Sequence, residues 1–148
     1  MIVLVAGTGT DVGKTFVTVA VVKSLRRRDV AVAVRKPVQS FVPGATDTDA
    51  ELLAAASGES PHTVCPAHRW IPAAMAPPIA ATSLGLPPFT IEDLVGDLGD
   101  PVRGLTIVES VGGVRSPIAC DGDTVALADA IAPELVVLVA DAGLGTIN

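Results

Sequence analysis

The chain has 148 residues, a length that fits one domain able to bury a sizeable core. It carries 10 basic and 16 acidic residues for a net charge of −6, which disfavours nucleic acid as a main partner because phosphate backbones favour a basic face. Hydrophobic residues make up 49% but aromatic residues only 3%, so we expect an aliphatic core of the kind that surrounds a buried parallel sheet.

The first residues and the cysteines favour a soluble, cytoplasmic protein. Residues 1–5 lack the basic region and the long apolar stretch of a signal peptide. The apolar run at 131–140 is too short to span a bilayer and contains Pro133, so we expect no membrane partner. Cys65 and Cys120 lie far apart without a C-x-x-C pair, and we interpret them as free thiols.

The first half of the chain alternates between strand and helix patterns. A short apolar run ending at glycine predicts a strand over 2–6, and helical spacing with a basic end predicts a helix over 14–28. A second strand is predicted over 30–35 and a proline-containing loop over 36–46. A helix is predicted over 47–57.

The second half continues the alternation after an irregular, proline-rich stretch at 60–78 and a short helix beyond it. The remaining predicted elements are helices over 90–98 and 124–132 and strands over 105–109 and 135–140. Alternating strands and helices predict an α/β fold, with a parallel sheet and helices on both faces. Ligands of such sheets bind where the strands end.

Residues 7–15, Gly-Thr-Gly-Thr-Asp-Val-Gly-Lys-Thr, follow a predicted strand and open a predicted helix, which is the context of a phosphate-binding loop. The strict motif G-x-x-x-x-G-K-[ST] requires glycine where this chain has Thr8. Lys14 would reach the β- and γ-phosphates, and the Thr15 hydroxyl would ligate Mg²⁺. The expected ATP- and phosphate-binding residues are Gly9, Thr10, Asp11, Val12, Gly13, Lys14, Thr15 and Glu109. With this loop the predicted α/β fold resembles P-loop nucleoside triphosphatases, and we expect residues 1–148 to form a single ATP-binding domain.

Three charged residues lie at the expected carboxyl edge of the sheet. Lys36 is either a solvated lysine at a strand end or a cation that neutralises a transferring phosphoryl group. We expect Asp47 to cap the helix that follows, which leaves Asp49 as a possible metal ligand. Glu109 ends an apolar strand, where it would coordinate Mg²⁺ near the phosphates unless it is simply an exposed strand end. His62, His68 and Trp70 are interpreted as loop and packing residues, because no catalytic triad or zinc-ligand spacing includes them.

Taken together, these segments resemble the dethiobiotin synthetase family. The loop at 7–15 matches the family pattern G-T-x-T-x-V-G-K-T, including the threonine that departs from the strict motif. The other matching segments are 36–40 (K-P-V-x-S/T), Asp49, 75–78 (M-A-P), 108–113 (V-E-G-A-G-G) and 145–148 (G-T/C-I/L-N). The chain departs from the family at Phe41, Ser110 and Val111, which are bulkier than the usual residues.

The resemblance implies an ATP- and Mg²⁺-dependent ligase of biotin biosynthesis, a cyclo-ligase that carboxylates 7,8-diaminononanoate with CO₂ and closes the ureido ring of dethiobiotin. It implies catalytic roles for Lys14, Lys36 and Thr10, and a metal site at Thr15, Asp49 and Glu109. Ser40 would contact the carbamate together with Thr10 and Lys36. The substrate carboxylate would bind Gly145, Thr146, Ile147 and Asn148 across a homodimer interface.

Family members continue for roughly half this length again, so we expect the chain to lack the final third of a complete enzyme. Two other functions stay open from the residues alone. One is a related amidotransferase-type P-loop domain that activates a carboxylate on a larger cofactor. The other is a non-catalytic nucleotide switch resembling partition and septum-site ATPases.

Overall fold

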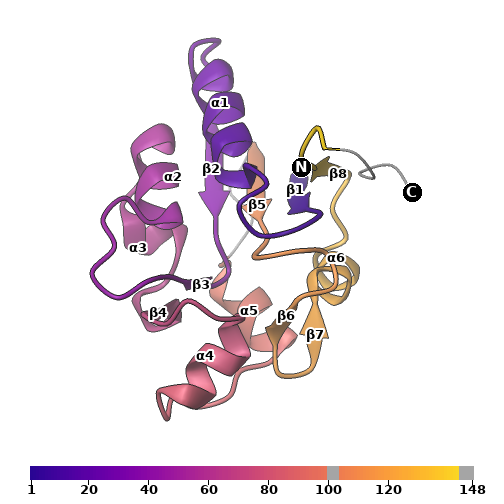
Figure 1. The fold of residues 1–148 in the computed structure, drawn as a ribbon. Coiled ribbons are helices and arrows are strands. Elements are labelled where there is room, and N and C mark those ends of the chain that lie inside the picture. Colours follow the sequence, from indigo (N-terminus) through magenta and orange to yellow (C-terminus); the bar gives the residue numbers. More distant parts are fainter. Residues whose placement is uncertain (100–103, 144–148) are drawn as a thin grey trace.

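A parallel sheet of four strands forms the centre of the fold in the computed structural model, which describes residues 1–99 and 104–143. The strands are β1 (Ile2–Gly7), β2 (Val32–Arg35), β5 (Leu105–Glu109) and β8 (Leu135–Val139), in the order β2-β5-β1-β8 (Figure 1). Val5 pairs with Glu109 and Gly7 with Val139, so the strands end together at one edge of the sheet.

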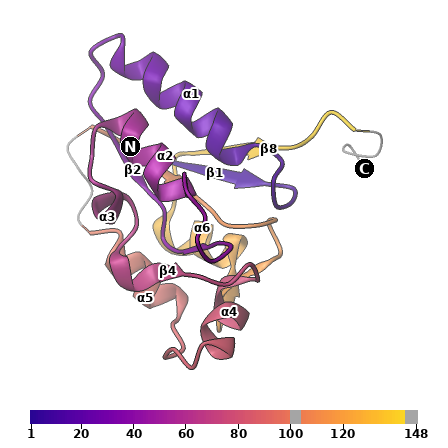
Figure 2. The same ribbon diagram turned by 60° about the vertical axis from the view of Figure 1, so that its left-hand side comes forward.

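Helices cover both faces of this sheet, as predicted. One group comprises α1 (Lys14–Arg26), α2 (Asp49–Ser57) and α3 (Pro61–Val64), and the other comprises α4 (Pro77–Ser83), α5 (Ile91–Asp97) and α6 (Thr124–Ile131). Because successive strand side chains point to opposite faces, Val3 and Val5 join the core beneath the first group and Leu4 joins the core beneath the second. Figure 2 shows α1 above β1 and β8, with α5 and α6 below.

The main predicted elements are confirmed, with small differences at their ends. The predicted strand over 30–35 begins at Val32, and the helix predicted over 14–28 ends at Arg26. The strand predicted over 105–109 has the same bounds in the structure. Arg26 also reaches a neighbouring helix, since its guanidinium donates a hydrogen bond to the carbonyl of Ala56 at 3.0 Å.

The prediction that Asp47 caps the second helix was wrong. The capping residue of α2 is Thr48, whose backbone N and Oγ1 both donate to the Glu51 carboxylate, at 2.8 and 2.7 Å. Asp47 lies outside the helix with a left-handed φ of 60°, a conformation that aspartate tolerates better than most residues. This one-residue shift places Asp49 at the first helical position.

Several short elements lie in regions predicted to be irregular. The predicted loop over 36–46 contains β3 (Gln39–Ser40), which pairs in parallel with β4 (Trp70–Ile71). The stretch predicted as irregular over 60–78 contains α3, the 3₁₀ helix η1 (Ala67–Arg69) and β4. A small hairpin of β6 (Pro117–Ala119) and β7 (Gly122–Asp123) was not predicted at all. Such two- and three-residue strands have too little periodicity to be seen in a sequence.

Strand β8 lies at one edge of the described sheet. Leu135 is 53% exposed and Leu138 is 57% exposed, although both belong to an uninterrupted apolar strand. Within residues 1–99 and 104–143, no helix has the length and apolar character needed to cross a membrane.

Candidate nucleotide-binding site

The loop between β1 and α1 has the backbone shape that its glycines allow. Gly13, directly before α1, has a left-handed φ of 95°. A Cβ at Gly7 would lie 2.9 Å from Cδ of Lys14 and 3.0 Å from Cγ2 of Val12, so a side chain there would displace these two side chains. The Lys14 ammonium lies across the loop and donates to the carbonyls of Gly9 and Gly112, each at 2.8 Å. The loop therefore holds a lysine above free backbone amides at a helix start.

The helix start itself supplies those amides. The first backbone hydrogen bond of α1 is donated by Val17 to the carbonyl of Gly13, at 3.0 Å. In the described part of the chain, the amides of Lys14, Thr15 and Phe16 have no backbone acceptor. Together with the partial positive charge of a helix N-terminus, three such donors suit an anion such as a phosphate chain.

Lys36 is buried, so the alternative of a solvated strand-end lysine was wrong. Its side chain is 1% exposed and its ammonium donates to Asp49 at 2.6 Å and to Glu109 at 2.8 Å. A third hydrogen bond goes to the carbonyl of Ser110 at 3.3 Å. Glu109 is fully buried, which also excludes the alternative of an exposed strand end.

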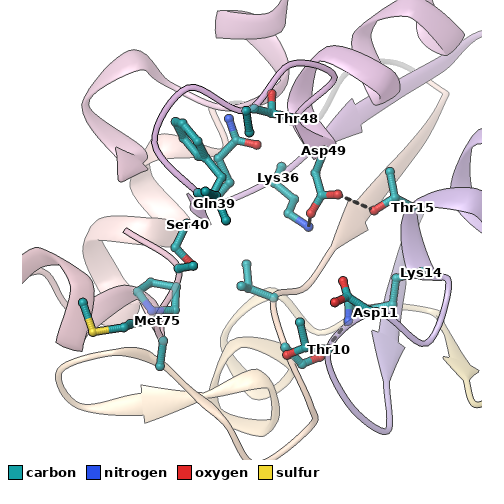
Figure 3. A pocket seen from close by; sticks show the side chains of 18 of the residues that line it. Thr10, Asp11, Lys14, Thr15, Lys36, Gln39, Ser40, Thr48, Asp49 and Met75 are labelled. Atoms are coloured by element: carbon teal, nitrogen blue, oxygen red, sulfur yellow. Dashed lines mark hydrogen bonds and ion pairs between the residues drawn. The ribbon is translucent and has the colours of Figure 1, made fainter. Parts of the chain in front are cut away.

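Thr15 joins this cluster from the phosphate-binding loop. Its hydroxyl lies 2.8 Å from Oδ1 of Asp49 and 2.9 Å from Oε1 of Glu109. The structure thus brings together the three residues predicted to form a metal site, and Figure 3 shows Lys36, Asp49 and Thr15 pointing toward one another. Residues from β5, α1 and α2 meet here because all three elements end or begin at the same edge of the sheet.

The charges of this cluster compensate one another. Burial would lower the pKa of Lys36, but the neighbouring carboxylates of Glu109 and Asp49 raise this pKa above its ordinary value. Burial opposes ionisation of Asp49, yet the Lys36 ammonium and two hydrogen bonds hold the pKa of Asp49 below its ordinary value. Burial and the positive charge of Lys36 lower the pKa of Lys14. Two ammonium groups and two carboxylates thus lie together at the loop.

The cluster has the donor chemistry of a magnesium site. A hydroxyl and two carboxylates are hard oxygen ligands, which Mg²⁺ prefers, and Mg²⁺ usually completes its shell with water and phosphate oxygens. Oε2 of Glu109 is buried and has no hydrogen-bond partner, so the protein leaves this acceptor unsatisfied. Among the described residues, no group of three or more His, Cys, Asp and Glu side chains could hold a metal ion, and this cluster supplies two carboxylates and one hydroxyl.

A cavity of about 780 Å³ joins the loop to a second group of residues. On one side lie Thr10, Asp11, Gly13, Lys14 and Thr15. On the other side lie Ser40 of β3 and Met75, and Figure 3 shows them across the cavity from Thr10. Ser40 thus faces the same space as the loop, whereas Gly145, Thr146, Ile147 and Asn148 lie outside the described residues.

The three departures from the family pattern have different environments. Phe41 lines the cavity and packs edge-to-face on Trp70, with ring centroids 6.0 Å apart. Val111 also lines the cavity, while Ser110 is fully buried beneath it and its hydroxyl has no hydrogen-bond partner. Phe41 and Val111 are therefore the substitutions that change the surface of the cavity.

Sequence reasoning missed Gln39. Its side chain is 2% exposed, and its Oε1 accepts a hydrogen bond from the backbone N of Ala50 at 3.0 Å. This bond ties β3 to the first turn of α2, one residue beyond Asp49. The sequence feature that could have indicated Gln39 is its position between Lys36 and Ser40, two residues predicted to belong to the site.

The histidines and the tryptophan have packing roles, as predicted. The rings of His62 and Trp70 lie 5.1 Å apart, and Nε1 of Trp70 donates to the carbonyl of Cys65 at 2.8 Å. His68 contacts Asp97 at 3.1 Å, away from the cavity. Both cysteines are free thiols, Cys65 buried and Cys120 exposed.

The parallel sheet, the loop between β1 and α1 and the lysine above free amides define a P-loop nucleotide-binding α/β protein. A family model described as an AAA domain matches residues 2–148, which is nearly the whole chain.

Curated relatives narrow this class. A protein of Rhodococcus erythropolis is 40% identical over 99% of the chain and 65% of its own length, and one of Aquifex aeolicus is 36% identical over 100% and 66%. A protein of Methylobacterium nodulans is 35% identical over 97% of the chain and 69% of its own length. All three are named ATP-dependent dethiobiotin synthetase. The chain therefore belongs to the dethiobiotin synthetase family, and it spans about two thirds of the length of these relatives.

Proposed function

We propose that the chain is the nucleotide-binding part of an ATP-dependent dethiobiotin synthetase. The observation that carries this proposal is the meeting of Lys36, Asp49, Glu109 and the loop residue Thr15 at one end of a single cavity. A nucleotide site alone needs no second buried lysine. A buried cation beside the phosphate-binding loop suits an enzyme that places a second anion next to the γ-phosphate.

ATP would bind along the loop at 7–15. The Lys14 ammonium would exchange its contacts with the carbonyls of Gly9 and Gly112 for the β- and γ-phosphates. The amides at the start of α1 would hold the phosphate oxygens, as at other helix N-termini. Gly13 is needed for this because its left-handed backbone turns the loop into the helix.

Thr15, Asp49 and Glu109 would hold a magnesium ion, directly or through water. Bound there, the ion would neutralise charge on the β- and γ-phosphates. Glu109 suits this role because one of its oxygens is buried without a partner. Asp49 suits it because its carboxylate lies at the first position of α2, within 2.8 Å of the Thr15 hydroxyl.

Lys36, Thr10 and Ser40 would bind the carbamate that CO₂ forms with one amine of 7,8-diaminononanoate. A carbamate oxygen would attack the γ-phosphorus, the bond from this phosphorus to the β–γ bridging oxygen would break, and ADP would leave. The second amine would then attack the carbamoyl carbon and release inorganic phosphate as the ring closes. These residues would position the carbamate and neutralise negative charge, because the carbamate and the γ-phosphate are both anions and must approach each other closely.

The same proposal covers the wider setting of the reaction. The substrate carboxylate would bind residues 145–148 across a homodimer interface, in a cytoplasmic enzyme without nucleic-acid or membrane partners. The length of the relatives supports an active enzyme that is longer than the 148 residues of this chain.

The test is turnover of the diamine. With Mg·ATP, bicarbonate and 7,8-diaminononanoate, the protein should release ADP, and mass spectrometry should detect dethiobiotin. Lys14→Ala should abolish nucleotide binding or turnover, whereas Lys36→Ala should reduce turnover far more than nucleotide affinity. Lys23→Ala, at an exposed position of α1, is the matched control and should change neither.

Nucleotide binding without any diamine-dependent ADP release would contradict the substrate assignment. Equal loss of binding and turnover in Lys36→Ala would instead make Lys36 a nucleotide ligand.

A further inference from the structure

Phe16 is the most exposed large hydrophobic residue in the described part of the chain. It is 79% exposed, compared with 60% for Met1 and 61% for Val42. It is also one of only three phenylalanines in the sequence. Packing a flat partner against a solvent-exposed aromatic ring is favourable, because it removes apolar surface from water.

Phe16 lies at the proposed nucleotide site. Phe16 directly follows Thr15, and it lines the same cavity as Lys14 and the loop. Thr18, two residues further along α1, is buried, so the first turn of the helix has one face toward the cavity and another toward the core. The exposed ring is therefore part of the proposed site and separate from the core.

The order of the free amides indicates which part of a ligand lies near Phe16. The proposed β- and γ-phosphate contact, Lys14, and the proposed magnesium ligand, Thr15, come first. The Phe16 amide is the last free donor before the helix hydrogen bonds begin at Val17. If Lys14 holds the β- and γ-phosphates, the phosphate left for the Phe16 amide is the one that carries the nucleoside.

We propose that the Phe16 ring packs against the nucleoside of the bound nucleotide and supplies a contact that the phosphate-binding loop cannot make. This inference rests on the proposed nucleotide site. It makes Phe16 a binding residue for the base or the ribose, with no part in phosphoryl transfer. Base–aromatic stacking tolerates different bases because every base has a flat π-face.

The experiment compares two ligands that carry the same number of phosphates. Isothermal titration calorimetry with Mg²⁺ would measure adenylyl imidodiphosphate, which has a nucleoside, and inorganic tripolyphosphate, which has none. Phe16→Ala should weaken the nucleotide by about five- to tenfold or more and leave tripolyphosphate unchanged. Phe16→Trp should keep the nucleotide affinity. Val21→Ala, at another exposed position of α1, should change neither.

Fluorescence of Phe16→Trp gives a second measurement. Its emission should change on adding the nucleotide but not on adding tripolyphosphate, while unsubstituted protein reports the background from Trp70.

The outcomes separate this inference from the proposed function. Equal nucleotide affinity in Phe16→Ala and the unsubstituted protein, with tripolyphosphate bound by both, would overturn the role of Phe16 and leave the phosphate site intact. Failure of the unsubstituted protein to bind either ligand would overturn the nucleotide site itself.

Discussion

Lys36 and Glu109 form a buried ion pair in which Nζ lies 2.8 Å from Oε1. The pairing of β2 with β5 brings the two residues together. Arg35 lies opposite Val108, and Lys36 and Glu109 are the residues that follow them in the sequence. Asp49 joins from α2 at 2.6 Å. The ammonium therefore contacts the carboxylates proposed to bind a divalent cation, and the two cations would compete for the same oxygens.

Replacing Lys36 by methionine should strengthen metal binding in the absence of nucleotide. Loss of a positive charge about 3 Å from both carboxylates should raise Mn²⁺ affinity by about tenfold or more. Electron paramagnetic resonance of free Mn²⁺ measures this affinity, with Lys23→Met as the control. Affinity equal to or below that of the unsubstituted protein would contradict the competition.

The same variant should be less stable until metal is added. Breaking a buried ion pair typically costs about 3–5 kcal/mol, because the remaining charge is buried without compensation. Urea unfolding should show this loss for Lys36→Met, and Mn²⁺ should restore part of it. A loss that Mn²⁺ does not reduce would mean that the carboxylates do not bind the metal.

Glu109→Gln should weaken the dependence of the proposed reaction on Mg²⁺. The amide keeps the size of the side chain but removes the negative charge that attracts the ion. The Mg²⁺ concentration that gives half-maximal ADP release should therefore rise about tenfold or more. The matched control is Glu92→Gln at an exposed position of α5. An unchanged Mg²⁺ titration would remove Glu109 from the metal site.

Thr90→Ala should destabilise the protein without affecting the nucleotide site. Thr90 caps α5: its Oγ1 accepts a hydrogen bond from the backbone N of Asp93 at 3.1 Å. Loss of such a cap costs about 1 kcal/mol, which urea unfolding can measure. Thr90→Ser keeps the hydroxyl and should retain most of the stability. Equal losses in both variants would show that the methyl group matters more than the cap.

Cys65 and Cys120 should differ in their reaction with iodoacetamide. Burial raises the pKa of the Cys65 thiol to about 12, so this thiol is neutral at pH 8 and also inaccessible. Cys120 is exposed. Mass spectrometry of peptides from the native protein at pH 8 should find the label on Cys120, and on Cys65 only after denaturation. Early labelling of Cys65 would indicate that the region packed around Trp70 opens readily.

Local patterns were sufficient wherever a feature depends on neighbouring residues. The strand over 105–109 is predicted with the bounds that the structure has, because a short apolar run ends there at a carboxylate. The α2 cap was placed one residue early, since Asp47 and Thr48 are both good capping residues and the backbone decides between them. The hairpin of β6 and β7 left no periodic signal to detect.

The phosphate-binding loop and the α/β class can be predicted from the sequence alone. Glycines that allow a left-handed turn, a lysine and a threonine at a helix start, and alternating strands and helices are all local properties of the chain. The burial of Lys36 is known from the three-dimensional structure, because the sequence is compatible with both a solvated and a buried lysine. Its partners Asp49 and Glu109 lie 13 and 73 residues away, and strand order together with the placement of α2 brings them into contact. Burial then turns three separate charges into one coupled cluster, since charges interact more strongly away from water.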